Sequence, residues 1–183
     1  MLNHYSIVIH PEDHIIELFK SYKDTLFSKI GKFGSRNSIA HITILEFSAT
    51  EKELKTIIEK LIKIVRIENH FDAIFDKVVY SKNLFVSPDK DGNEHFKKLL
   101  VNVRTSIKGE KNKSDAHLTI GRNLKPDQIQ NSIELFSNVK FNFHCDQIAL
   151  RRFNENIGQY EILQLFPFSS EDSKDETIQI TLF

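Results

Sequence analysis

The chain has 183 residues, and its 25 lysines and arginines are balanced by 25 aspartates and glutamates, so the formal charge at pH 7 is zero. This balance argues against a protein that binds along long nucleic acids, because such proteins usually have an excess of basic residues that neutralises the phosphate backbone. The single cysteine, Cys145, excludes an internal disulfide and a cysteine-based metal site, and no apolar run approaches the roughly 20 residues of a membrane span.

The length fits one domain over residues 1–183, and the 40% of apolar residues are enough to form a core. The first residues, Met1-Leu2-Asn3-His4, lack the basic start and apolar stretch of a signal peptide. We therefore expect a soluble cytoplasmic protein, and we expect it to be a monomer without a membrane partner.

Hydrophobic periodicity predicts the order strand, helix, strand, helix, strand in the first half of the chain. The helix after the first strand ends at Gly31, and the second helix starts at Thr50, where Glu53 completes a capping box. The predicted elements are a strand at 5–10, a helix at 13–30, a strand at 39–47, a helix from 50 to about 65 and a strand at 71–79.

The second half of the chain predicts the same order. Its elements are a strand at 83–87, a helix at 95–107, a strand around 117–120, a helix that starts near Pro126 and buries Ile129, Ile133 and Phe136, and strands at 141–152 and 159–168. Residues 169–176 form an acidic linker, and 177–183 alternate as a last strand would. Two similar halves, about 1–82 and 83–168, predict an α+β fold with two lobes related by a pseudo-twofold axis rather than a solenoid.

One short pattern occurs once in each half, as His41-Ile42-Thr43-Ile44 and His117-Leu118-Thr119-Ile120. Side chains alternate between the two faces of a strand, so each His shares a face with its Thr while the aliphatic residues point into a core. Two such units facing each other would combine two titratable imidazoles with two hydroxyl donors. Those groups are what cleavage of a phosphodiester without a metal requires.

Paired His-x-Thr-x motifs in a duplicated α+β chain of this length resemble the 2H phosphoesterase superfamily, specifically the LigT-like group of 2′-5′ RNA ligases. The resemblance extends to the opening strand at 5–11 and to the closing segments 145–152 and 158–163. It implies a bilobal fold in which two mainly antiparallel sheets line a central cleft, with the helices outside. It also implies metal-independent chemistry on 2′,3′-cyclic phosphates or 2′-5′ linkages of RNA ends or small nucleotides.

The four motif residues are therefore the predicted catalytic residues: His41, Thr43, His117 and Thr119. A neutral imidazole would take a proton from water while a charged one protonates the leaving oxygen, and the hydroxyls would donate to the phosphate oxygens. Which His acts as base and which as acid stays open. The reference pKa of histidine, near 6.5, predicts an optimum roughly between pH 6 and 8.

Three further residues are candidate substrate contacts. Arg122 follows the second motif and suits a phosphate or ribose, Tyr160 suits stacking on a base, and His10 ends its strand beside the expected cleft. For each one an ordinary surface or packing role is the alternative. No metal-ligand spacing and no glycine-rich phosphate loop is present, so we expect neither a metal nor another cofactor.

Three alternatives remain open. Both histidines could be ordinary cross-strand neighbours on a sheet surface. The protein could bind nucleotides or RNA ends without turnover. It could also be a 2H enzyme for 2′-5′ oligoadenylates or for a cyclic phosphate of ADP-ribose.

Overall fold

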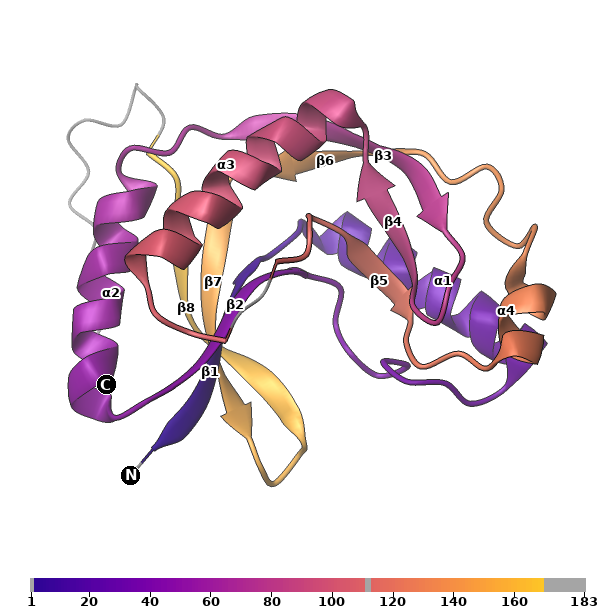
Figure 1. Cartoon of the computed structure of the whole chain (residues 1–183), viewed down its shortest axis with the longest axis horizontal. Coiled ribbons are helices and arrows are strands. Elements are labelled where there is room, and N and C mark those ends of the chain that lie inside the picture. Colours follow the sequence, from indigo (N-terminus) through magenta and orange to yellow (C-terminus); the bar gives the residue numbers. More distant parts are fainter. Residues whose placement is uncertain (1, 111–112, 170–183) are drawn as a thin grey trace.

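The computed structural model describes residues 2–110 and 113–169, and within them the chain forms two four-stranded antiparallel sheets (Figure 1). The first sheet has the order β2-β1-β7-β8, made of β1 at Asn3–Ile9, β2 at Ile42–Ala49, β7 at Gln147–Asn154 and β8 at Gln159–Pro167. The second has the order β5-β4-β3-β6, made of β3 at Phe71–Val79, β4 at Leu84–Pro88, β5 at Leu118–Gly121 and β6 at Phe141–Cys145.

Four helices flank the sheets in the described ranges: α1 at Asp13–Ile30, α2 at Glu51–Val65, α3 at Lys90–Ser106 and α4 at Pro126–Ser132. Helices α1 and α4 pack together beside β5, and α2 and α3 pack together beside β2 (Figure 1). None of the helices in this part of the chain is long and apolar enough to cross a membrane. The predicted α+β fold with two antiparallel sheets is confirmed.

The two sheets correspond strand by strand, because the order β2-β1-β7-β8 matches β5-β4-β3-β6. The helices follow this relation in part: α1 follows a strand of the first sheet and packs on β5 of the second, while α3 follows a strand of the second sheet and packs both on β2 of the first and on β3 and β4 of its own. Each sheet nevertheless combines strands from both sequence halves, since β3 pairs with β4 and β7 pairs with β1. The sequence halves 1–82 and 83–168 are therefore interlocked rather than being the two sheets.

The predicted strand over 141–152 is two strands that belong to different sheets. β6 pairs with β3, β7 pairs with β1 and β8, and Asp146 between them belongs to neither strand. Hydrophobic alternation continues through this segment, so periodicity does not show where the chain passes from one sheet to the other.

Most helix boundaries agree with the sequence pattern, including the whole of α1 and the Thr50–Glu53 capping box of α2. Helix α3 begins at Lys90 instead of residue 95, with the Asp89 side chain capping the Gly92 amide at 2.8 Å. Gly92 lies in the first turn of this helix. A glycine suits this position because a Cβ there would come within 2.7 Å of the Ala73 Cβ on β3. Helix α4 ends before Ile133, which is 44% exposed rather than buried. The predicted last strand at 177–183 and all but the first residue of the 169–176 linker lie outside the described residues.

A cluster of phenylalanines forms part of the core between the second sheet and α3. The Phe75 ring stacks on the Phe141 ring with centroids 5.3 Å apart, and it also packs against Phe96 and Phe143. Because β3, β6 and α3 all contribute rings, this cluster fixes the second sheet rigidly behind its cleft-facing side.

Candidate active site

Each motif occupies the same place in its sheet. His41 and His117 directly precede β2 and β5, and each Thr is the second residue of its strand. The aliphatic neighbours are buried, while the His and Thr side chains are only partly buried. The alternation predicted for both motifs is therefore present, and both His–Thr pairs lie on the side of the strand away from the core.

Both imidazoles are held by the backbone in the same way. The Nδ1 atom of His41 lies 2.6 Å from the carbonyl oxygen of Ile39, and the Nδ1 of His117 lies 2.8 Å from that of Asp115. A carbonyl oxygen only accepts hydrogen bonds, so each Nδ1 must carry the proton. The neutral form of each ring then has its lone pair on Nε2, which makes no hydrogen bond to the described residues.

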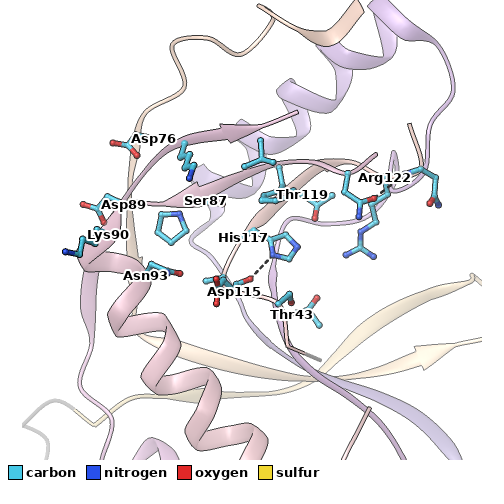
Figure 2. A pocket seen from close by; sticks show the side chains of 18 of the residues that line it. Thr43, Asp76, Ser87, Asp89, Lys90, Asn93, Asp115, His117, Thr119 and Arg122 are labelled. Carbon is cyan, nitrogen blue, oxygen red and sulfur yellow. Dashed lines mark hydrogen bonds between the residues drawn. The ribbon is translucent and has the colours of Figure 1, made fainter. Parts of the chain in front are cut away.

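The motif residues line two adjoining cavities. The larger, here called the main cleft, has a volume of about 1150 Å³ and lies between β2 and the second sheet; Thr43, His117, Thr119 and Arg122 line it (Figure 2). The smaller, here called the His41 cavity, has a volume of about 190 Å³ and is lined by His41, Thr119, Arg122, Asn123 and part of the loop before β2. Thr119, Arg122 and Asn123 line both, so all four motif residues surround one site made of two adjoining cavities.

Burial and charge act on both imidazoles. Burial is the main cause that lowers the pKa of His41 to about 3, and the positive charges of Arg151, Arg122 and Lys23 lower it further. Burial also lowers the pKa of His117, and the charge of Arg122 lowers it further, while the hydrogen bond to the Asp115 carbonyl and the Asp115 carboxylate oppose that shift. Both rings are neutral at pH 7 in the free protein, and His41 is the harder of the two to protonate.

Arg151 lines neither cavity, but its charge acts on His41, and sequence reasoning missed it. It is only 8% exposed, its Nε donates to the Ser6 hydroxyl at 3.0 Å, and its guanidinium lies 5.1 Å from the centre of the Tyr160 ring. Burial lowers the pKa of Arg151 to about 10, so it remains charged. An arginine directly after the buried run Ile148-Ala149-Leu150 was the available signal, but the sequence does not show which residues surround it.

Sequence reasoning also missed Lys23, although its place in the helical pattern could have indicated a buried lysine. It is buried on α1 together with Phe19 and Leu26, at the spacing of the helix's apolar face. Its Nζ donates to the carbonyl and the hydroxyl of Ser38, in the loop that leads to His41. A lysine within an apolar helical stripe predicts a buried cation with specific partners.

The three candidate substrate contacts have different locations. Arg122 lines both cavities, as its place after the second motif predicted. The Tyr160 ring is covered on one face by Arg151 and packs edge-on against Phe153, and it lines neither cavity. His10 is half-buried after β1 and also lines neither. The structure therefore places Arg122 with the motifs, but neither Tyr160 nor His10.

The walls of the main cleft combine an aromatic ring with charged groups of both signs. The Phe85 ring lies 4.8 Å from the His117 ring, and the acidic groups Glu46, Asp76, Asp89 and Asp115 alternate with Lys77, Lys90 and Arg122. Among the described residues, no three His, Cys, Asp or Glu side chains are grouped so that they could hold a metal ion.

Comparisons with known proteins agree with this arrangement. A family model described as the 2′-5′ RNA ligase superfamily matches residues 11–156, while no curated protein matches by sequence. E. coli LigT complexed with NADP⁺ has a TM-score of 0.73 at 11% identity, over 93% of this chain and all of that one. E. coli LigT complexed with 3′-AMP has a TM-score of 0.71 at 12% identity over the same shares.

A third solved structure, TT0787 of Thermus thermophilus, has a TM-score of 0.70 at 18% identity, over 92% of this chain and 99% of its own. These identities establish a shared fold, and the family model covers most of the chain. The chain therefore belongs to the 2′-5′ RNA ligase superfamily, and its fold is similar to that of E. coli LigT.

Proposed function

We propose that this protein is a phosphoesterase that acts, without a metal, on 2′,3′-cyclic phosphate ends or 2′-5′ linkages of RNA or nucleotides. The observation that supports this most directly is the matched pair of imidazoles, each held through Nδ1 by a backbone carbonyl and each followed by a threonine in the same site. The complex of E. coli LigT with 3′-AMP supports a nucleotide as the ligand.

In hydrolysis, the Nε2 of a neutral histidine removes a proton from the water that attacks phosphorus. The Nε2–H of the other, protonated histidine donates its proton to the departing ribose oxygen, so the P–O bond to that oxygen breaks as the new one forms. The Thr43 and Thr119 hydroxyls donate to the non-bridging oxygens, where negative charge increases. When a 5′-hydroxyl takes the place of water, the same attack on a 2′,3′-cyclic phosphate breaks the bond from phosphorus to the 3′-oxygen, which takes the proton of the acid, and a 2′-5′ linkage is formed.

The unequal surroundings support an assignment of the two roles. Three cations within range of His41 favour its neutral form, which is the form that a general base needs. At His117 the hydrogen bond to the Asp115 carbonyl and the Asp115 carboxylate favour the charged form against the single cation Arg122, and a bound phosphate would favour it further. We therefore assign His41 as the base and His117 as the acid in hydrolysis.

The test is turnover of a nucleoside 2′,3′-cyclic phosphate in the presence of EDTA, with the position of the product phosphate assigned by NMR. We expect hydrolysis at an unchanged rate after chelation, because the motif residues supply the base, the acid and the phosphate donors. Binding of the nucleotide without turnover would indicate a non-catalytic module. Loss of the rate in EDTA, with a rate that otherwise climbs steadily with pH, would indicate a metal-bound hydroxide.

A further inference from the structure

The backbone carbonyls that hold the two imidazoles belong to loops, and each of these loops is held by a cation from a helix. Ile39, which accepts from His41, lies in the loop between α1 and β2. Asp115, which accepts from His117, lies in the loop between α3 and β5 (Figure 2). A loop backbone is less constrained than a strand, so the orientation of each ring depends on the contacts that fix its loop.

Lys23 holds the loop before the first motif. Its Nζ donates to the carbonyl oxygen of Ser38, the residue directly before Ile39, and to the Ser38 hydroxyl at 3.0 Å. The Ser38 hydroxyl and amide both donate to the Ser35 carbonyl, at 2.9 and 3.1 Å. Lys23 is only 2% exposed, and a buried ammonium group is stable only with such hydrogen-bond partners. The turn that leads to His41 is therefore fixed from the interior of the protein.

Arg104 holds the loop before the second motif in the same way. Its Nη2 donates at 3.0 Å to the carbonyl oxygen of Ser114, the residue directly before Asp115. Its Nε donates at 2.9 Å to the carbonyl oxygen of Ile44, at the end of the first motif. Arg104 therefore connects the loop before His117 to the strand that contains the first motif.

The two contacts match in position, although the two cations do not. Each cation donates to the carbonyl three residues before a motif histidine, and each ring donates to the carbonyl two residues before it. Lys23 lies in the middle of α1, whereas Arg104 lies in the last turn of α3. Neither cation pairs with a carboxylate of the described residues. A contact that is repeated by different residues at different helix positions favours a role that both motifs share over a local packing role.

We propose that Lys23 and Arg104 are positioning residues for His41 and His117. Each cation fixes the carbonyl that accepts from Nδ1, and this keeps Nε2 as the nitrogen that transfers protons in the reaction. Without the cation the loop carbonyl can turn away, and the ring then also adopts the form with its proton on Nε2, which cannot act as a base. The inference deepens the proposed function and rests on it, because proton transfer at Nε2 is the step assigned to both rings.

The direct test is NMR of the imidazole nitrogens at pH 7, where both rings are neutral, because it distinguishes a protonated nitrogen from an unprotonated one. In the native protein both rings should have their proton on Nδ1. Lys23→Met should convert His41 to a mixture of the two neutral forms and leave His117 unchanged. Arg104→Met should do the reverse, because each cation holds the loop of only one histidine.

Two lysines on the same helices are matched controls. Lys20 on α1 is paired with Glu17, Lys97 on α3 is exposed, and neither donates to a motif loop in the described ranges. Lys20→Met and Lys97→Met remove the same charge from the same helices, so both should give the native spectra and the native kcat.

Turnover of a nucleoside 2′,3′-cyclic phosphate measures the consequence for the reaction. Lys23→Met and Arg104→Met should each lower kcat by about 10- to 100-fold, because a misplaced imidazole transfers protons poorly. KM should change little, because neither side chain lines the main cleft or the His41 cavity.

Native nitrogen spectra in both methionine variants would overturn the proposal. A change of both rings in either variant would also overturn it, because a general loosening of the fold would then be the cause. Arg104 is half-buried and its substitution is the milder one, so Arg104→Met decides the matter if Lys23→Met does not fold. If the native protein does not hydrolyse the cyclic phosphate, the proposed function is refuted, while the spectra still decide whether the two cations position the rings.

Discussion

The two copies of the His-x-Thr motif have the same local geometry but different surroundings. Each ring donates from Nδ1 to the carbonyl of the residue two positions earlier, at the start of an equivalent strand. Around His41, however, the charged neighbours are Arg151, Arg122 and Lys23. His117 instead lies beside the Phe85 ring, and the charges that act on it are Arg122 and the Asp115 carboxylate.

This difference shows how a duplicated unit can perform two tasks. The short-range backbone contact determines which nitrogen carries the proton, and it is repeated because the motif is repeated. The charge that surrounds each ring comes from elements that are distant in sequence, and these differ between the halves. Substitutions of the motif residues, which both halves share, and of the charged residues around only one motif should therefore change the activity by different amounts.

The largest effect is expected when an imidazole is removed. His41→Ala and His117→Ala should each lower kcat/KM for a nucleoside 2′,3′-cyclic phosphate by about 10²- to 10⁴-fold, the usual contribution of a general acid or base. His144→Ala is the control, because His144 pairs with Asp72 and lines neither cavity. A folded His41 or His117 variant with the native rate would refute the catalytic assignment.

A smaller loss is expected at the threonines. Thr43→Val and Thr119→Val keep the shape of the side chain but remove the hydroxyl donor, and we expect kcat to fall by about tenfold or more in each. Thr119 lines both cavities whereas Thr43 lines only the main cleft, so Thr119→Val should have the larger effect. Steady-state kinetics of the two variants side by side would measure this, and an unchanged kcat in both would exclude a role for the hydroxyls.

The pH dependence of kcat/KM should reflect the different surroundings of the His41 and His117 rings. The base must be deprotonated and the acid protonated, so kcat/KM should fall as pH rises through the lowered pKa of His117. Its optimum is therefore expected on the acid side of 6.5, toward the lower end of the pH 6 to 8 predicted from unperturbed histidines, while a bound phosphate should move the kcat profile upward. An optimum of kcat/KM above pH 7 would contradict the assignment.

A substitution of Arg151 should reduce the difference between the pKa values of His41 and His117 without changing a residue of either motif. Arg151→Gln removes a positive charge that lowers the pKa of His41, so that pKa should rise, with the same direction of change in the acidic limb of kcat/KM. NMR titration of the imidazole carbons would measure the shift for each ring. The His117 pKa is the internal control and should change less, because Arg151 is not among the charges that act on it.

The smallest effect is expected on stability. A histidine whose pKa is lowered in the folded state takes up its proton in the unfolded state first, so the free energy of unfolding should decrease as pH falls below 6.5, down to about pH 3 for His41. His41→Gln should make this decrease shallower than in the native protein. Urea denaturation of both proteins between pH 7 and 4 would test it, and identical slopes would mean that His41 is not held neutral by its surroundings.

Local patterns in the sequence were enough for most of the fold. Helix α1 and strand β3 have the predicted bounds, and the capping box at Thr50 is formed, because these features depend on residues within a few positions of one another. The segment 141–152 was not predictable in this way: its apolar alternation is continuous, yet Asp146 separates strands of two different sheets. Strand pairing is a long-range property, and a period of two residues contains no information about the partner.

The candidate site likewise has features that depend on local sequence and features that depend on long-range contacts. Alternation along a strand is a local property, so the sequence was enough to predict the two His–Thr pairs, the face that each pair shares and the buried aliphatic residues behind them. That Lys23 from α1 and Arg151 from β7 act on the first motif, and that Thr119, Arg122 and Asn123 line both cavities, follows from the tertiary structure. Burial and Coulomb interactions depend on distance in space rather than along the chain, so the difference between two nearly identical motifs arises only when the chain folds.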